Sequence, residues 1–91
     1  MNVNVCTADT PVITGKGKLH TVSIGPVTAS VTAGLLTVYD NTAESGTVLY
    51  KEWVLTSVVG HTITLDCEFY TGLYVSFDST LANAAVTVTY A

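Results

Sequence analysis

Charged side chains are scarce in this sequence. Only 11% of its 91 residues are charged, against roughly 25% in an ordinary soluble domain. Three are basic, Lys16, Lys18 and Lys51, and the formal net charge is −4. A phosphate backbone is bound through several clustered positive charges, so we expect no nucleic-acid partner. Three scattered lysines are equally unsuited to an anionic membrane surface.

Long apolar runs and targeting signals are also missing. No run approaches the ~20 residues that a membrane-spanning helix needs, and the first residues hold neither the basic nor the apolar segment of a signal peptide. We therefore expect no membrane association and a protein made in a cytoplasm.

Groups that catalyse reactions or bind metals are few. The two cysteines, Cys6 and Cys67, lie far apart, and neither they nor His20 and His61 have a spacing suited to zinc. We expect two small buried thiols, although the spacing leaves a disulfide open. No G-x-S-x-G motif occurs. The prediction is no catalytic residue, no cofactor and no metal site.

The carboxylates do not form a convincing site either. Asp40 and Glu44 share one turn, whereas Asp66 and Glu68 would share one strand face, where they could bind a cation or point to water. A glycosidase needs two carboxylates that flank a cleft. The full set is Asp9, Asp40, Glu44, Glu52, Asp66, Glu68 and Asp78.

Threonine and valine dominate instead, with sixteen and fourteen copies. Both are β-branched and suit a pleated, half-buried surface. Short alternating runs recur between turn signals, and residues 40–46 are the clearest turn. The fold predicted is all-β, a single compact antiparallel β-sandwich or small barrel. Its strands are expected at 2–6, 11–14, 18–24, 35–39, 47–57, 62–66, 73–77 and 85–90, with 27–32 either a strand or a loop.

The same alternation predicts which side chains are buried. His20, Val22 and Ile24 should share one face of their strand, and a bulge or break is expected near Lys51 and Glu52. The predicted core consists of Leu19, Val22, Ile24, Leu36, Val38, Leu49, Trp53, Leu65, Val75 and Val86.

Aromatic residues are numerous for so small a chain. They should fill a core or a subunit interface, where tyrosine and tryptophan are enriched. The alternative is an exposed aromatic row that binds glycans, in which Trp53 and Tyr74 would take part. The eight are Tyr39, Tyr50, Trp53, Phe69, Tyr70, Tyr74, Phe77 and Tyr90.

Four segments together resemble the small capsid decoration (cement) proteins of tailed bacteriophages. Residues 17–24 read G-K-L-H-T-V-S-I, and residues 36–47 form the most specific motif, L-T-V-Y-D-N-T-A-E-S-G-T. T-G-L-Y-V at 71–75 and V-T-V-T-Y at 86–90 complete the pattern. The resemblance covers most of residues 17–91, which we expect to form the β-sandwich domain, and leaves 1–16 as an N-terminal arm or edge strand.

The resemblance implies a non-enzymatic virion protein that binds the major capsid protein on the outer surface of the head, as a homotrimer, and stabilises the shell. It carries over no catalytic residue. Two alternatives remain open: a head-fibre base, tail or baseplate component, and a glycan-binding β-sandwich module.

Overall fold

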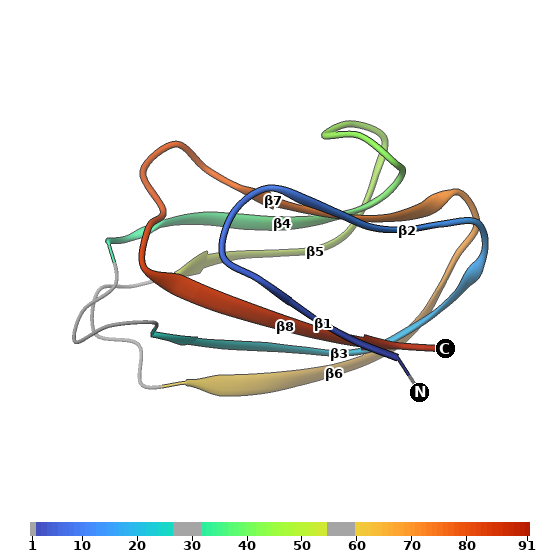
Figure 1. The fold of residues 1–91 in the computed structure, drawn as a ribbon, viewed down its shortest axis with the longest axis horizontal. Coiled ribbons are helices and arrows are strands. Elements are labelled where there is room, and N and C mark those ends of the chain that lie inside the picture. Colours follow the sequence, from blue (N-terminus) through green and yellow to red (C-terminus); the bar gives the residue numbers. More distant parts are fainter. Residues whose placement is uncertain (1, 27–31, 55–59) are drawn as a thin grey trace.

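The computed structural model describes residues 2–26, 32–54 and 60–91, which form eight β-strands (Figure 1). The strands are β1 (Asn2–Cys6), β2 (Thr10–Thr14), β3 (Gly17–Pro26), β4 (Gly34–Asp40), β5 (Thr47–Val54), β6 (His61–Phe69), β7 (Gly72–Phe77) and β8 (Ala84–Tyr90). The described residues contain no helix, and hence none that could span a membrane. The predicted all-β class is confirmed.

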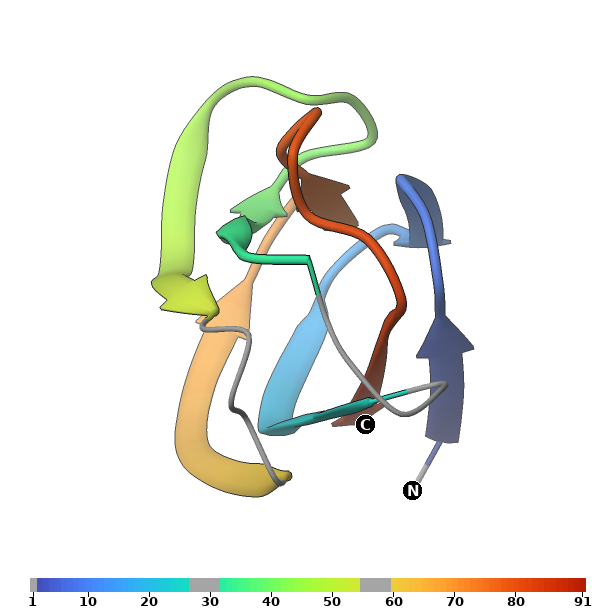
Figure 2. The same cartoon turned by 90° about the vertical axis from the view of Figure 1, so that its left-hand side faces the viewer.

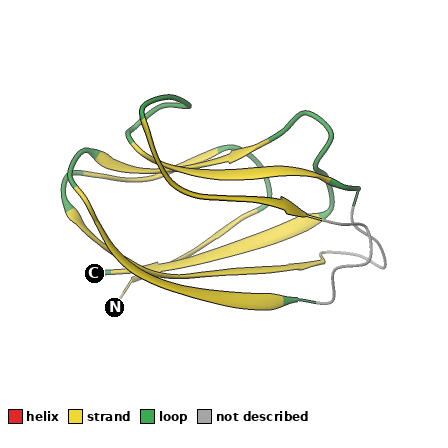
Figure 3. Cartoon of the chain, turned by 180° about the vertical axis from the view of Figure 1, so that it is seen from behind, coloured by secondary structure: helices red, strands yellow, loops and turns green. Residues whose placement is uncertain are grey.

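The strands build two four-stranded antiparallel sheets. Sheet A has the order β1-β8-β3-β6 and sheet B the order β2-β7-β4-β5, and the two lie face to face as the layers of a sandwich (Figures 1 and 3). Only β4 and β5 are consecutive strands within one sheet, and they are joined by residues 41–46 of the predicted turn, whose first residue, Asp40, ends β4. Every other connection crosses between the sheets. This strand order is that of a jelly roll.

The described connections between strands lie at the two ends of the sandwich. Those that follow β2, β4 and β6 lie at the end where both termini are found (Figure 1). Figure 2 faces the opposite end, where the β7–β8 connection passes from sheet B to sheet A.

The core lies between the sheets and consists of small and medium apolar side chains. Of the ten predicted core residues, seven are fully buried, whereas Leu49 and Leu65 are only partly buried and pack against its border. The seven are Leu19, Val22, Ile24, Leu36, Val38, Val75 and Val86.

The predicted faces of β3 are wrong at His20. Leu19, Val22 and Ile24 are all buried, which strict alternation forbids. The pairing of β3 with both β6 and β8 shifts between Leu19 and Thr21. This β-bulge changes the phase of the strand, so that His20 leaves the buried face and Leu19 joins it.

The prediction that Trp53 belongs to the core is also wrong, because its side chain is 53% exposed. In β5 the irregularity lies at Leu49, the extra residue between the pairs Val38–Tyr50 and Tyr39–Val48, and not at Lys51 and Glu52. With this phase Val54 points inward and is fully buried, so its neighbour Trp53 points outward. Residues 55–57 and 27–31, for which we predicted a strand end and a strand or loop, lie outside the described residues.

The first sixteen residues contribute one edge strand to each sheet. β1 pairs with β8 at the edge of sheet A, and β2 pairs with β7 at the edge of sheet B. Cys6, at the end of β1, is buried in the common core.

Candidate interaction surfaces

The outer face of sheet B carries a group of aromatic and apolar side chains. The register pairs Leu35 with Trp53, and Tyr39 with Tyr74. Their strand neighbours Leu36, Val38 and Val75 point into the core, so these four point away from it. We call Leu35, Tyr39, Trp53 and Tyr74 the aromatic face.

A shallow hollow adjoins the aromatic face. The β4–β5 loop folds over the outer side of sheet B, where the Ser76 hydroxyl donates a hydrogen bond of 2.6 Å to the Glu44 carboxylate. Ser76 and Thr37 are buried in consequence. The hollow has a volume of about 230 Å³ and is lined by residues that include Leu35, Tyr39 and Glu44. Here apolar surface, aromatic rings and a few polar groups lie together, as in the contact regions of protein interfaces.

The outer face of sheet A is different, because two rows of mainly hydroxyl-bearing side chains cross it. Two rows cross all four strands, Val3–Thr89–Thr21–Thr64 and Val5–Thr87–Ser23–Thr62. Ser23 and Thr62 are joined by a hydroxyl hydrogen bond of 2.8 Å, and Thr21 is similarly joined to Thr89. The two rows contain no charged residue and end in two exposed valines on β1.

Asp40 joins two connections at the end of the sandwich that carries the termini. Its carboxylate accepts hydrogen bonds from the backbone N–H groups of Tyr70, Thr71 and Gly72, with the shortest, from Thr71, at 2.8 Å. Burial opposes ionisation of this carboxyl group, but the three N–H groups outweigh it, so the pKa of Asp40 lies below its ordinary value of 3.8. The aspartate of the hairpin motif therefore has a structural role.

We expect replacement of Asp40 by Ala to lower the free energy of unfolding by about 1–2 kcal/mol at neutral pH, because three N–H groups lose a charged acceptor. The lowered pKa means that the ionised carboxylate stabilises the fold above pH 3.8, and that this contribution is lost as the pH falls through the folded-state pKa. The difference in the free energy of unfolding between Asp40→Ala and the wild type, measured by urea unfolding, should therefore shrink well below pH 3.8. The Asp40→Asn variant keeps the size of the side chain and removes its charge. Its free energy of unfolding should lie between those of the wild type and Asp40→Ala. An unchanged difference at low pH would refute this role of the charge.

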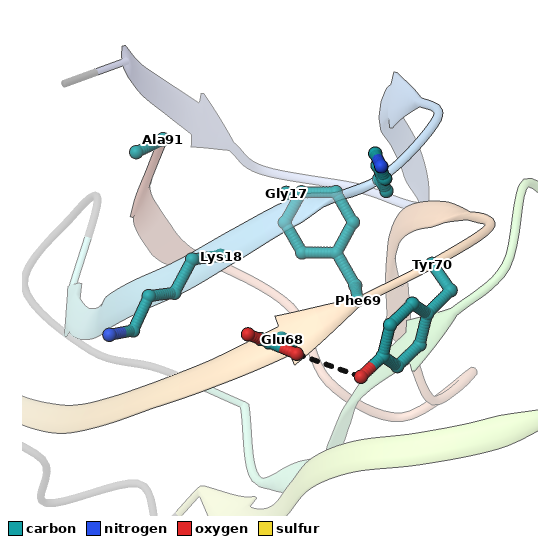
Figure 4. Close-up of a pocket in the computed structure, with 7 residues that line it drawn as sticks. Gly17, Lys18, Glu68, Phe69, Tyr70 and Ala91 are labelled. Atoms are coloured by element: carbon teal, nitrogen blue, oxygen red, sulfur yellow. Dashed lines mark hydrogen bonds between the residues drawn. The ribbon is translucent and has the colours of Figure 1, made fainter.

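A larger hollow, of about 460 Å³, lies at the same end, beside Phe69 (Figure 4). Lys16 and Lys18 lie on its rim, and the Tyr70 hydroxyl donates a hydrogen bond of 2.8 Å to the Glu68 carboxylate. The Phe69 ring packs against Gly17, where a Cβ atom would lie 2.6 Å from the ring. Two pairs of lining residues thus contact each other, Tyr70 with Glu68 and Phe69 with Gly17, and the hollow suggests no specific ligand.

Among the side chains that the structure describes, the groups considered for chemistry lie in separate local contacts. His20 contacts Asp66 through its Nδ1 atom, a contact that holds the pKa of the Asp66 carboxyl below its usual value. His61 is paired with Ile24 through the backbone at the start of β6. Asp66 and Glu68 are both exposed but have different partners, His20 and Tyr70. Across the described parts of the chain, no three potential metal ligands form a group.

Both cysteines are free thiols, so the disulfide that the spacing left open is not formed. Cys6 is buried at the end of β1, and Cys67 is partly buried on β6. Burial is the main cause that raises the pKa of each thiol. Because the thiolate is the reactive form, both are poor nucleophiles.

Comparison of the chain with protein-family models, with curated proteins and with solved structures found no match. Its function must therefore be argued from its own residues. The sequence predicts Trp53 in the core and gives an exposed row with Trp53 and Tyr74 only as the alternative, whereas both residues lie on the outer face of sheet B. The signal that could have revealed the position of Trp53 is the slip in alternation within β5, between Leu49 and Val54.

Proposed function

We propose that this protein is a non-enzymatic decoration protein of a tailed-phage head, which binds the major capsid protein from outside and stabilises the shell. The observation that carries the proposal is the aromatic face of sheet B, with Trp53 half exposed beside Leu35. Tryptophan and tyrosine dominate the binding energy of protein interfaces. The major capsid protein is proposed as the partner because the sequence motifs resemble those of phage cement proteins.

The low charge of the chain supports the same role. A free protein in solution gains solubility from charged side chains, whereas a surface that becomes covered by a partner has less need of them. Many copies bound to one shell would each make a weak contact. A copy that spans two neighbouring capsomers links these contacts, and the second contact then forms at a high effective concentration. Such clamping would oppose the pressure of the packaged DNA.

A glycan-binding module is the second candidate, because Tyr39, Trp53 and Tyr74 share one face. Sugar rings stack on exposed aromatic rings, and of these three only Trp53 is exposed, while Tyr39 and Tyr74 are partly buried. A platform of one exposed ring is narrow for a glycan. The aromatic face is better suited to a protein surface, which can contact Leu35 and the adjoining hollow as well as the Trp53 ring.

The experiment that tests the proposal is a count of this chain in purified particles of the phage that encodes it. We expect a copy number that is a simple fraction of that of the major capsid protein. A few copies per particle would instead indicate a tail, baseplate or head-fibre component.

A further inference from the structure

Each sheet has two edge strands, and the four edges differ in how they are protected. An open edge presents unpaired N–H and C=O groups to any other strand, so natural sheets blunt their edges with proline, charge or a bulge. Three of the four edges here carry such features. β1 carries none.

The three protected edges each use a different combination. β2 contains Pro11, and its pairing with β7 shifts between Pro11 and Ile13. β5 has the bulge at Leu49, followed by the exposed Lys51. β6 has the irregular pairing opposite His20, and Asp66 and Glu68 are exposed on it.

β1 is regular, uncharged and apolar on its outer side. All five residues pair with β8 without a shift in register. The segment reads N-V-N-V-C, and Val3 and Val5 are 62% and 60% exposed. Among the described residues, β8 is the only strand that pairs with β1. The other edge of β1 is therefore open for pairing with a further strand.

We propose that β1 pairs in an antiparallel manner with β1 of a second copy, around a twofold axis at Asn4. A second copy is the natural occupant because, among the sheet edges that the structure describes, β1 alone lacks a protective feature, and its N-V-N-V-C segment is complementary to itself about Asn4. The chain has a net charge of −4, yet β1 itself is uncharged and adds no repulsion at the contact. The pairing would make the chain a dimer and not the homotrimer that the resemblance implies, but it uses none of the residues of the aromatic face, on which the proposed capsid contact depends.

The register follows from the symmetry. With the axis at Asn4, all five residues of each β1 find a partner, and Val3 lies opposite Val5 of the partner subunit. Two valine pairs then cover each other on the outer face, which is the kind of cross-strand contact that stabilises sheets. Two copies of sheet A become one continuous sheet, and the hydroxyl rows run on from one copy to the other.

The test is the molar mass of the purified full chain, measured by light scattering during size exclusion. We expect twice the 9.5 kDa of one chain. The double variant Val3→Lys/Val5→Lys places like charges opposite each other across the axis and should raise the dissociation constant at least about 100-fold. Val48→Lys is the matched control, because Val48 is an exposed valine on the protected edge strand β5; it should leave the dimer intact.

A second measurement does not depend on the stability of the lysine variant. Asn4→Cys places a thiol on the axis, so mild oxidation should produce a covalent dimer, whereas Thr64→Cys on β6 should not. A monomeric wild-type chain, a trimer as the resemblance implies, or equal cross-linking of both cysteine variants would overturn the β1 pairing. Because these assays use the chain alone, their failure leaves the binding to phage heads as a separate question.

Discussion

We expect the Gly72→Ala variant to lose about 3 kcal/mol of folding free energy. An 80–100-residue domain has only about 5–15 kcal/mol in total, so the variant should be marginally stable. Its melting temperature should fall by roughly 12–24 °C, since each kcal/mol is worth about 4–8 °C in a domain of this size. Thermal unfolding followed by circular dichroism would measure the change.

The reason is the close packing of β7 at its first residue. A Cβ atom on Gly72 would lie 2.5 Å from the backbone oxygen of Ile13 and 3.1 Å from that of Asn41. Both belong to backbone, in β2 and at the start of the β4–β5 loop, and cannot turn aside as a flexible side chain can. Relief of the clash would also disturb the hydrogen bond from the Gly72 N–H group to Asp40.

The matched control is Gly25→Ala in β3. A Cβ atom there would find nothing closer than the Cα atom of Gly60 at 3.9 Å, an ordinary contact. This variant should change the stability by less than about 0.5–1 kcal/mol, because alanine also restricts the unfolded chain. Equal losses at Gly72 and Gly25 would show that the close approach at Gly72 is not what makes glycine necessary.

We expect the Trp53→Ala variant to bind phage heads at least about 30-fold more weakly than the wild type, which corresponds to a hot spot of about 2 kcal/mol. The assay is co-sedimentation of the purified chain with heads that lack it, over a range of concentrations. The fold should survive, because the Trp53 side chain is 53% exposed and exposed positions seldom contribute much to stability.

Tyr70→Ala is the control for this experiment. Tyr70 is an aromatic residue of even greater exposure, 69%, but it lies beside the Phe69 hollow at the end of the sandwich and not on the aromatic face. Its loss should leave binding within about twofold of wild type, the effect of a peripheral contact. Wild-type binding by Trp53→Ala would refute the assignment of the aromatic face to the capsid. Weaker binding to a glycan, with unchanged binding to heads, would favour the second candidate.

The strands could be predicted from sequence because they depend on local properties. Threonine and valine favour extended backbone wherever they occur, and the polar residues at 40–46 interrupt the apolar pattern at the point where the β4–β5 hairpin turns. The order of the strands could not be predicted. Residues 2–6 pair with residues near 90, and nothing local to either segment identifies its partner.

The bulges limited the prediction of side-chain orientation. A single extra residue reverses the alternation beyond it, so the bulge at Leu49 placed Trp53 outside although its sequence neighbours suggested a core position. The same effect exchanged His20 and Leu19 in β3. Asp40 ends β4 rather than beginning the turn, and its three N–H donors come from residues 70–72, which become neighbours only in the folded chain.

The ratio of this chain to the major capsid protein in purified phage particles, measured by quantitative mass spectrometry, tests the proposed decoration function most directly. We predict one copy per capsid subunit or a simple fraction of it, as occupancy of every equivalent site on the shell requires. A handful of copies per particle would contradict decoration and place the chain at the tail or a single vertex. Complete absence from the particle would remove the virion role and bring the glycan-binding module forward.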